Sequence, residues 1–127
     1  MPATPKTVVL AGALDTKGQE YAYVKQLLEA QGLQTLVIDF GIMGSPAFAA
    51  DIARDEVVRA GGGDLAHLSS GGHKDEAMRV VAAGLAAVVR RLYDEKKMDG
   101  IFAMGGTGGT SVATTAMRAL PVGFPKL

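Results

Sequence analysis

Short apolar runs alternate with amphipathic stretches along this 127-residue chain. Runs rich in branched residues at 7–12, 35–40 and 101–104 predict strands that are buried on both faces of a sheet. Apolar residues at three- and four-residue spacing predict long helices, and shorter helices are expected beside them. The expected helices span about 19–31, 51–60, 74–97 and 111–120.

The order strand, helix, strand, two helices, strand, helix is typical of a parallel sheet covered on both faces. We therefore expect an α/β fold with three αβα layers and a Rossmann-like parallel sheet in the strand order 2-1-3. Residues 123–127 look like the opening of a fourth strand beside the third. The chain, residues 1–127, is thus expected to form one α/β nucleotide-binding subdomain of a longer protein, with a sheet that is incomplete at its C-terminal end.

Composition narrows the classes of function. Thirteen Lys plus Arg balance thirteen Asp plus Glu, which argues against nucleic acid as a main partner, because such binders carry a basic excess. The absence of cysteine excludes disulfides, thiolate metal sites and a thiol nucleophile. The N-terminus does not read as a signal peptide, and the apolar runs are too short for a bilayer. We expect a cytoplasmic protein with no membrane partner.

The most distinctive motif directly follows the third apolar run. It reads Gly105, Gly106, Thr107, Gly108, Gly109 and Thr110. Its glycines leave backbone N–H groups uncovered, and the helix expected from residue 111 adds its positive dipole end, so the stretch suits phosphate oxygens. Thr107 and Thr110 are expected to add hydroxyl donors. The motif lacks the lysine of a Walker A loop and the spacing of the Rossmann glycines. The alternative is a tight turn in which small residues let the helix pack on the sheet.

Polar residues follow the first and second strands at the same edge of the expected sheet. After the first strand, Lys17 is expected to neutralise a phosphate, Thr16 to hydrogen-bond it, and Asp15 to hold Mg²⁺ through water or to cap the next helix. Asp39 ends the second strand, where nucleotide-binding folds place a ribose-binding acid. The alternatives are a plain helix-entry loop for residues 15–17 and a turn residue for Asp39.

The remaining polar residues predict no further site. His67 is expected in a loop and His73 at the entry of the long helix. Two histidines that are separated in this way, without a carboxylate at ligand spacing, predict no metal site. Tyr21 and Tyr23 are interpreted as packing or surface residues, and no catalytic triad or carboxylate pair is visible.

Several stretches taken together resemble a known family. They are residues 14–18, 38–41, 76–78, 105–110 and 121–127. The combination resembles the Tm-one-like ATP-binding domain family, which is named after the tomato protein that confers resistance to tomato mosaic virus. Its bacterial members were long grouped as an uncharacterised protein family. The resemblance implies a longer protein of two α/β subdomains that binds ATP, with residues 105–110 and 15–17 in the signature loops. Residues 70–74 depart from the family pattern, because His-Lys stands where Asp-Arg is expected, so this stretch is not counted as a site.

Three functions remain open at this point. The first is a nucleotide-binding module whose ligand is ATP, with or without Mg²⁺, as the resemblance implies. The second is half of an enzyme that handles phosphoryl groups or sugar phosphates, with its catalytic residues elsewhere in the longer protein. The third is a non-catalytic scaffold for protein interaction. An open sheet edge also suggests a homo-oligomer or a protein partner.

Overall fold

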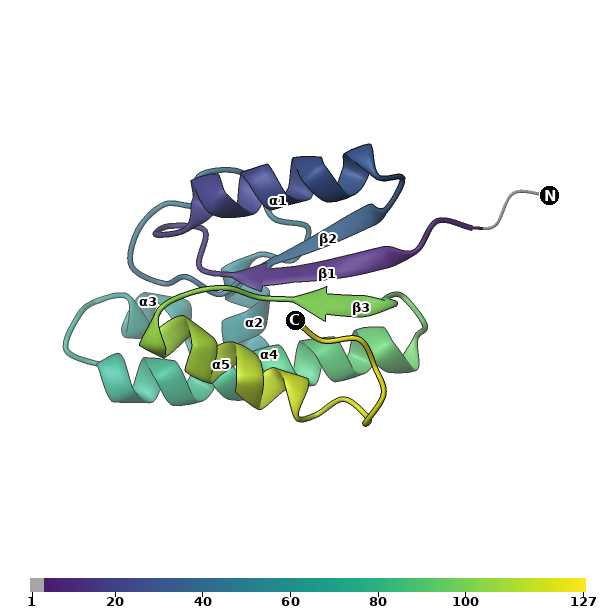
Figure 1. Cartoon of the computed structure of the whole chain (residues 1–127). Helices are drawn as coiled ribbons and strands as arrows, with labels where there is room; N and C mark the ends of the chain where they lie inside the picture. Colours follow the sequence, from purple (N-terminus) through teal and green to yellow (C-terminus); the bar gives the residue numbers. More distant parts are fainter. Residues whose placement is uncertain (1–3) are drawn as a thin grey trace.

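The computed structural model describes residues 4–127; residues 1–3, which the expected domain includes, lie outside the described part. Strands and helices alternate along the chain as the apolar pattern predicts (Figure 1). The elements are β1 (Thr7–Gly12), α1 (Gly18–Ala30), β2 (Gln34–Asp39), α2 (Arg54–Ala60), α3 (Leu65–Leu68), α4 (Lys74–Asp94), β3 (Gly100–Phe102) and α5 (Thr107–Met117).

The sheet is parallel, with the strand order β2-β1-β3 that the sequence predicts. β1 pairs with β2 along its whole length, from Thr7 opposite Gln34 to Gly12 opposite Asp39. It pairs with β3 over residues 8–10. A single parallel bridge between Ile101 and Lys126 places the last residues beside β3, at the position of the expected fourth strand. The three carboxyl ends therefore meet at one edge, where ligands bind in such sheets.

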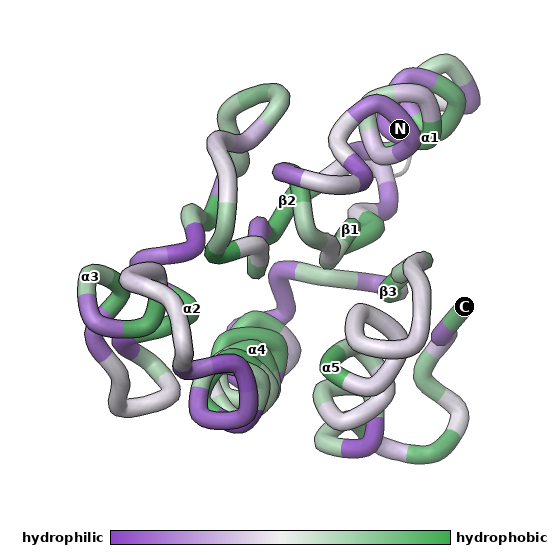
Figure 2. The backbone as a smooth tube through the Cα atoms, turned by 90° about the vertical axis from the view of Figure 1, so that its left-hand side faces the viewer, coloured by the Kyte–Doolittle hydropathy of each residue, from purple (hydrophilic) through white to green (hydrophobic). Residues whose placement is uncertain are grey.

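Helices cover both faces of the sheet (Figure 1). Successive residues of β1 point to opposite faces. Leu10 packs with Tyr21 of α1 in one apolar cluster, whereas Val9 and Ala11 belong to a larger cluster with α2, α4 and α5. Figure 2, turned by 90°, shows α4 between α2 and α5 on the side of the sheet opposite α1. The expected three-layer αβα arrangement is confirmed.

The structure departs from the predicted elements in several places, and four of these departures have a clear local reason. Residues 51–53 are not helical. The Ile52 N–H donates to Val37 O, and the Ile52 carbonyl accepts from the backbone N–H of Asp39, so this stretch pairs with the edge of β2 instead. α3 is a single short turn inside the stretch 41–72, which was expected to be irregular. α4 ends at Asp94, since Lys96 adopts a positive φ of 59°. α5 begins at Thr107, not at 111, so the last four of the six residues of the glycine motif are helical.

None of the helices within residues 4–127 combines the length and the apolar character that a membrane crossing requires.

Candidate functional site

A cavity of about 460 Å³ opens at the carboxyl ends of the three strands. Its wall is built by the loops that follow β1, β2 and β3, together with the N-terminal turns of α4 and α5. The size lies within the range of about 300–1,000 Å³ that is typical of small-molecule sites. The loops that the sequence predicts to follow the three strands thus surround the same cavity.

The N-terminus of α5 forms one side of this cavity. Gly106 is its N-cap residue and has an extended backbone, and the Thr110 N–H donates to Gly106 O in the first helical hydrogen bond, at 3.0 Å. The N–H groups of Thr107, Gly108 and Gly109 precede that bond, so they have no acceptor within the helix. The first turn carries no acidic residue and no side-chain cap. It therefore offers free donors and a positive dipole end to an anion.

The structure separates the glycines of this motif from its threonines. Four glycines line the cavity, whereas the two threonines do not. Thr110 instead donates from its hydroxyl to the carbonyl of Gly105, at 3.3 Å. The glycine part of the predicted phosphate loop thus lies at the cavity, and the predicted hydroxyl donors lie outside it. The lining glycines are Gly105, Gly106, Gly108 and Gly109.

The loop after β1 brings Asp15, Thr16 and Lys17 to the cavity wall together. Asp15 accepts through Oδ2 from the N–H groups of Met43, at 3.1 Å, and Gly44, at 3.0 Å. It thereby ties the loop after β2 to the loop after β1. Its other oxygen, Oδ1, is buried and has no hydrogen-bond partner within residues 4–127. Oδ1 packs so closely on the next loop that a Cβ on Gly41 would lie 2.3 Å from it. Asp15 therefore holds the loops after β1 and β2 against each other in this wall. Its role toward Mg²⁺ stays a prediction.

Asp39 lies outside the cavity, although it ends β2. Its carboxylate is 2% exposed and pairs with the Nε of Arg54 at 2.9 Å. The other oxygen accepts from the N–H groups of Leu14, at 3.1 Å, and Gly41, at 2.9 Å. Both oxygens are thus engaged in contacts that fix the loops after β1 and β2. In this arrangement Asp39 supports the wall from behind, and its role toward a ribose stays a prediction.

Tyr21 is a positioning residue that the sequence did not reveal. Its hydroxyl lies 2.6 Å from the carbonyl of Ala11 and accepts from the N–H of Met104 at 2.8 Å. Burial raises the pKa of this hydroxyl above its ordinary value of about 10, and the hydrogen bond from Met104 partly offsets this rise. Tyr21 thus joins α1 to the residue that precedes the glycine motif. The feature of the sequence that could have indicated this role is Gly12 at the end of the first strand, because a Cβ there would lie 2.1 Å from the Tyr21 ring.

The sequence predicts no site in residues 70–74, which precede and begin α4, but the structure places most of this stretch on the cavity wall. Gly71, Gly72, His73 and Lys74 all line the cavity. Lys74 adds a second positive charge to that of Lys17, against the single negative charge of Asp15. The feature of the sequence that could have indicated this part of the cavity wall is the pair Gly71 and Gly72 before the long helix.

The two histidines, expected to lie apart, are neighbours in the fold. Their ring centroids are 4.1 Å apart, and Glu76 lies beside both of them. The interpretation that these residues are separated is therefore wrong.

Comparison with known proteins identifies relatives over nearly the whole chain. A family model described as the N-terminal domain of the uncharacterised protein family UPF0261 matches residues 6–127. A UPF0261 protein of Clostridium tetani is 43% identical over 122 residues, which cover 96% of this chain and 30% of that protein. A UPF0261 protein of Rhizobium meliloti is 35% identical over 122 residues, with the same shares of 96% and 30%.

A more distant similarity extends to a plant protein. The ToMV resistance protein Tm-1(GCR237) of Solanum lycopersicum is 35% identical over 51 residues, which cover 40% of this chain and 7% of that protein. The resemblance found in the sequence is thus confirmed. The chain spans about 30% of the length of the bacterial relatives it matches. It belongs to the UPF0261 family, within which it corresponds to the N-terminal domain.

Proposed function

We propose that this chain binds a nucleotide and holds its phosphates at the N-terminus of α5. The observation that carries the proposal is the first turn of that helix, which is rich in glycine, has no side-chain cap and lines a cavity of ligand size. Backbone N–H groups and a helix dipole favour a phosphate group at such a place without any side-chain charge. Substituting these glycines would cover the donors, and this explains why residues without side chains suit the turn.

Two lysines give the cavity the charge that a polyphosphate requires. Lys17 and Lys74 both line the wall, and each ammonium group can pair with a phosphate oxygen. Thr16 supplies a hydroxyl between the strand end and Lys17. The free donors of α5 and the two cations thus converge on one space, which favours a ligand with several negative charges.

The apolar part of the wall suits a base. Phe40, Ile42, Met78 and Met104 line the cavity beside the glycine turn. Ligand sites commonly combine such apolar walls with a few polar groups that fix orientation. Methionine side chains are flexible and polarizable, and they make favourable contacts with aromatic rings. A nucleotide with its phosphates at α5 and its base against these side chains uses both parts of the cavity. The resemblance described above makes ATP the first nucleotide to test.

The binding test uses calorimetry and thermal shift with ATP, ADP, NAD and inorganic phosphate, each with and without Mg²⁺. The key variant is Gly109→Ala, because a Cβ on Gly109 meets no atom within 4 Å while the residue lines the cavity. We expect this variant to be as stable as the parent chain, or more stable by up to about 1 kcal/mol, since alanine favours a helix. We expect it to bind ATP about ten-fold more weakly, because the methyl group covers the donors.

Matched controls separate the site from general effects. Ser111→Ala makes a similar small change in the same helix at an exposed residue that does not line the cavity, and it should leave ATP affinity unchanged. Lys17→Ala should weaken ATP binding about ten-fold, since hydrogen bonds to charged groups contribute about 1.5–3 kcal/mol. Lys6→Ala removes the same charge next to the start of β1, at the other end of the sheet, and should have no effect. A folded chain that binds none of these ligands would refute the proposal and leave the glycine turn as architecture.

A further inference from the structure

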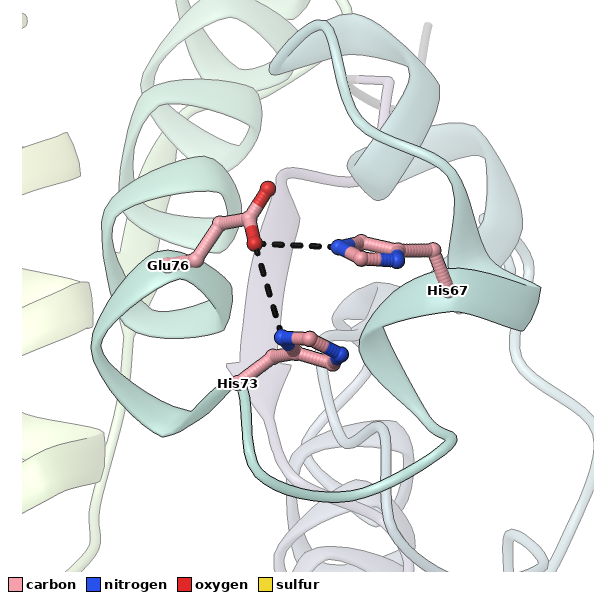
Figure 3. Close-up of side chains that lie close together, drawn as sticks. All are labelled: His67, His73 and Glu76. Carbon is pink, nitrogen blue, oxygen red and sulfur yellow. Dashed lines mark hydrogen bonds and ion pairs between the residues drawn. The ribbon is translucent and has the colours of Figure 1, made fainter.

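A cluster of His67, His73 and Glu76 at the rim of the cavity has the composition of a metal site, and we propose that it binds a divalent transition-metal ion such as Zn²⁺. The three side chains come from two elements and point toward one another (Figure 3). His67 lies on α3, His73 is the N-cap residue of α4, and Glu76 lies in the first turn of α4. The proposal is independent of nucleotide binding.

The distances fit a small ion with little movement. One ligand atom from each side chain lies within 4.8 Å of the others. Oε1 of Glu76 is 3.1 Å from Nε2 of His67 and 3.8 Å from Nδ1 of His73. Tetrahedral zinc with bonds of 2.0–2.1 Å holds its donor atoms about 3.3 Å apart. Small rotations of three partly exposed side chains therefore suffice to surround an ion.

The local fold brings the two histidines together in a defined way. Asp64 caps α3 by accepting from the His67 N–H at 3.3 Å. The chain then reverses through Gly71 and Gly72, whose φ angles of 95° and 74° lie in the region that favours glycine. This reversal places the His73 ring against the His67 ring. The glycine pair thus serves the cluster as well as the cavity wall.

The ligand set indicates the kind of metal and its coordination. Two imidazoles and one carboxylate form the three-ligand set of catalytic zinc sites, which leave further positions to water or substrate. The same set binds other first-row divalent ions with open positions, iron(II) among them. His73 also lines the cavity, so an ion held here would lie at the rim with its open positions available to a ligand.

The composition of the chain makes the test clean. It contains two histidines, both in the cluster, and no cysteine. The untagged chain is titrated with Zn²⁺ in competition with a chromogenic chelator, and with Co²⁺ while its visible absorption is recorded. We expect one ion per chain and a Co²⁺ spectrum of low-symmetry coordination by nitrogen and oxygen. Absence of stoichiometric binding of either ion would overturn the proposal, whatever the variants show.

Substitutions then assign the ligands. His67→Gln, His73→Gln and Glu76→Gln should each weaken Zn²⁺ binding by at least about ten-fold, because losing even an outer-shell partner costs 10- to 100-fold. Asp75→Asn removes the adjacent acidic charge in the same helical turn and should leave the affinity unchanged. The circular dichroism of each variant should match that of the parent, since the three side chains are 33–48% exposed. Equal affinity in the parent chain and in His67→Gln would show that the cluster is only a hydrogen-bonded one.

Discussion

A single buried hydroxyl illustrates how one residue positions the site. Tyr21 is fully buried in the apolar cluster under α1, and its hydroxyl reaches the backbone of β1 and of the segment after β3. Met104 immediately precedes Gly105, so this bond fixes the start of the glycine turn from the opposite side of the sheet. The benzene ring packs at Gly12, where any larger residue would collide with it.

Tyr21→Phe tests this role, because it keeps the ring and removes the hydroxyl. The Met104 N–H then loses its partner in a partly buried place, and the free energy of unfolding should fall by about 1–3 kcal/mol. Urea denaturation at pH 7 measures the change. Tyr23→Phe is the matched control, since Tyr23 is 63% exposed and its substitution should change stability little.

The raised pKa of Tyr21 adds a pH dependence with a definite sign. The folded state holds the phenol proton more tightly than the unfolded state, so the unfolded state loses it first as the pH rises. Stability should therefore be complete below about pH 10 and decline above it. The decline between pH 10 and 11 should be smaller in Tyr21→Phe. An identical decline in both chains would show that other groups cause it.

At the scale of elements, two glycines let α2 and α4 cross in close contact. A Cβ on Gly84 would lie 1.8 Å from the carbonyl oxygen of Val57, and one on Gly61 would lie 2.0 Å from that of Val80. Both collisions involve backbone atoms, which cannot rotate away as a side chain can. α4 in turn carries His73, Lys74 and Met78 to the cavity, so this crossing also positions one wall of the site.

Gly84→Ala should therefore destabilise the protein, although alanine is the better helix former. The helical preference favours the variant by up to about 1 kcal/mol, whereas overpacking at a close crossing costs about 1–3 kcal/mol. We expect a net loss of about 1–2 kcal/mol in urea denaturation. Gly109→Ala is the control with the opposite sign, because its Cβ meets open space. Equal stabilisation by both substitutions would contradict the close crossing.

Sequence patterns predict some helices and strands accurately and others poorly, for physical reasons. Buried parallel strands read as continuous apolar runs, so β1 and β2 were placed to within one residue. The start of α5 was misplaced, because glycine normally indicates a loop and only tertiary context turns Gly108 and Gly109 into a first helical turn. α3 was missed, since a single turn leaves no periodicity to detect.

The site was predicted in its loops more than in its contacts. Connectivity alone brings the ends of parallel strands to one edge, and this placed residues 15–17 and the glycine motif together. Side-chain directions depend on tertiary contacts that no sequence pattern specifies, such as the pairing of Asp39 with Arg54 and the hydrogen bond from Thr110 back to Gly105. The meeting of His67 with Glu76 depends on the reversal at Gly71 and Gly72, for which sequence spacing gives no measure.

At the scale of the whole molecule, the sheet has one edge that its own chain covers only lightly. The last residues run beside β3 and form three backbone hydrogen bonds there. The N–H of Ile101 donates to Pro125 O at 3.0 Å, and the N–H of Ala103 donates to Leu127 O at 2.9 Å. The N–H of Leu127 donates to Ile101 O at 3.0 Å. Phe124 adds an edge-on contact with the Tyr93 ring of α4, at 5.4 Å between centroids. This short segment thus protects an open edge of the sheet.

Deleting residues 121–127 should reveal how much this cover contributes. Three backbone hydrogen bonds at about 1 kcal/mol each, with an aromatic pair at about 1 kcal/mol, predict a loss of about 3–4 kcal/mol in urea denaturation. Phe124→Ala, which leaves the backbone bonds in place, should lose less. The exposed edge of β3 is a template for pairing with another strand, so the shortened chain should also self-associate in sedimentation velocity. A shortened chain that stays monomeric and fully stable would show that this edge of the sheet needs no cover from residues 121–127.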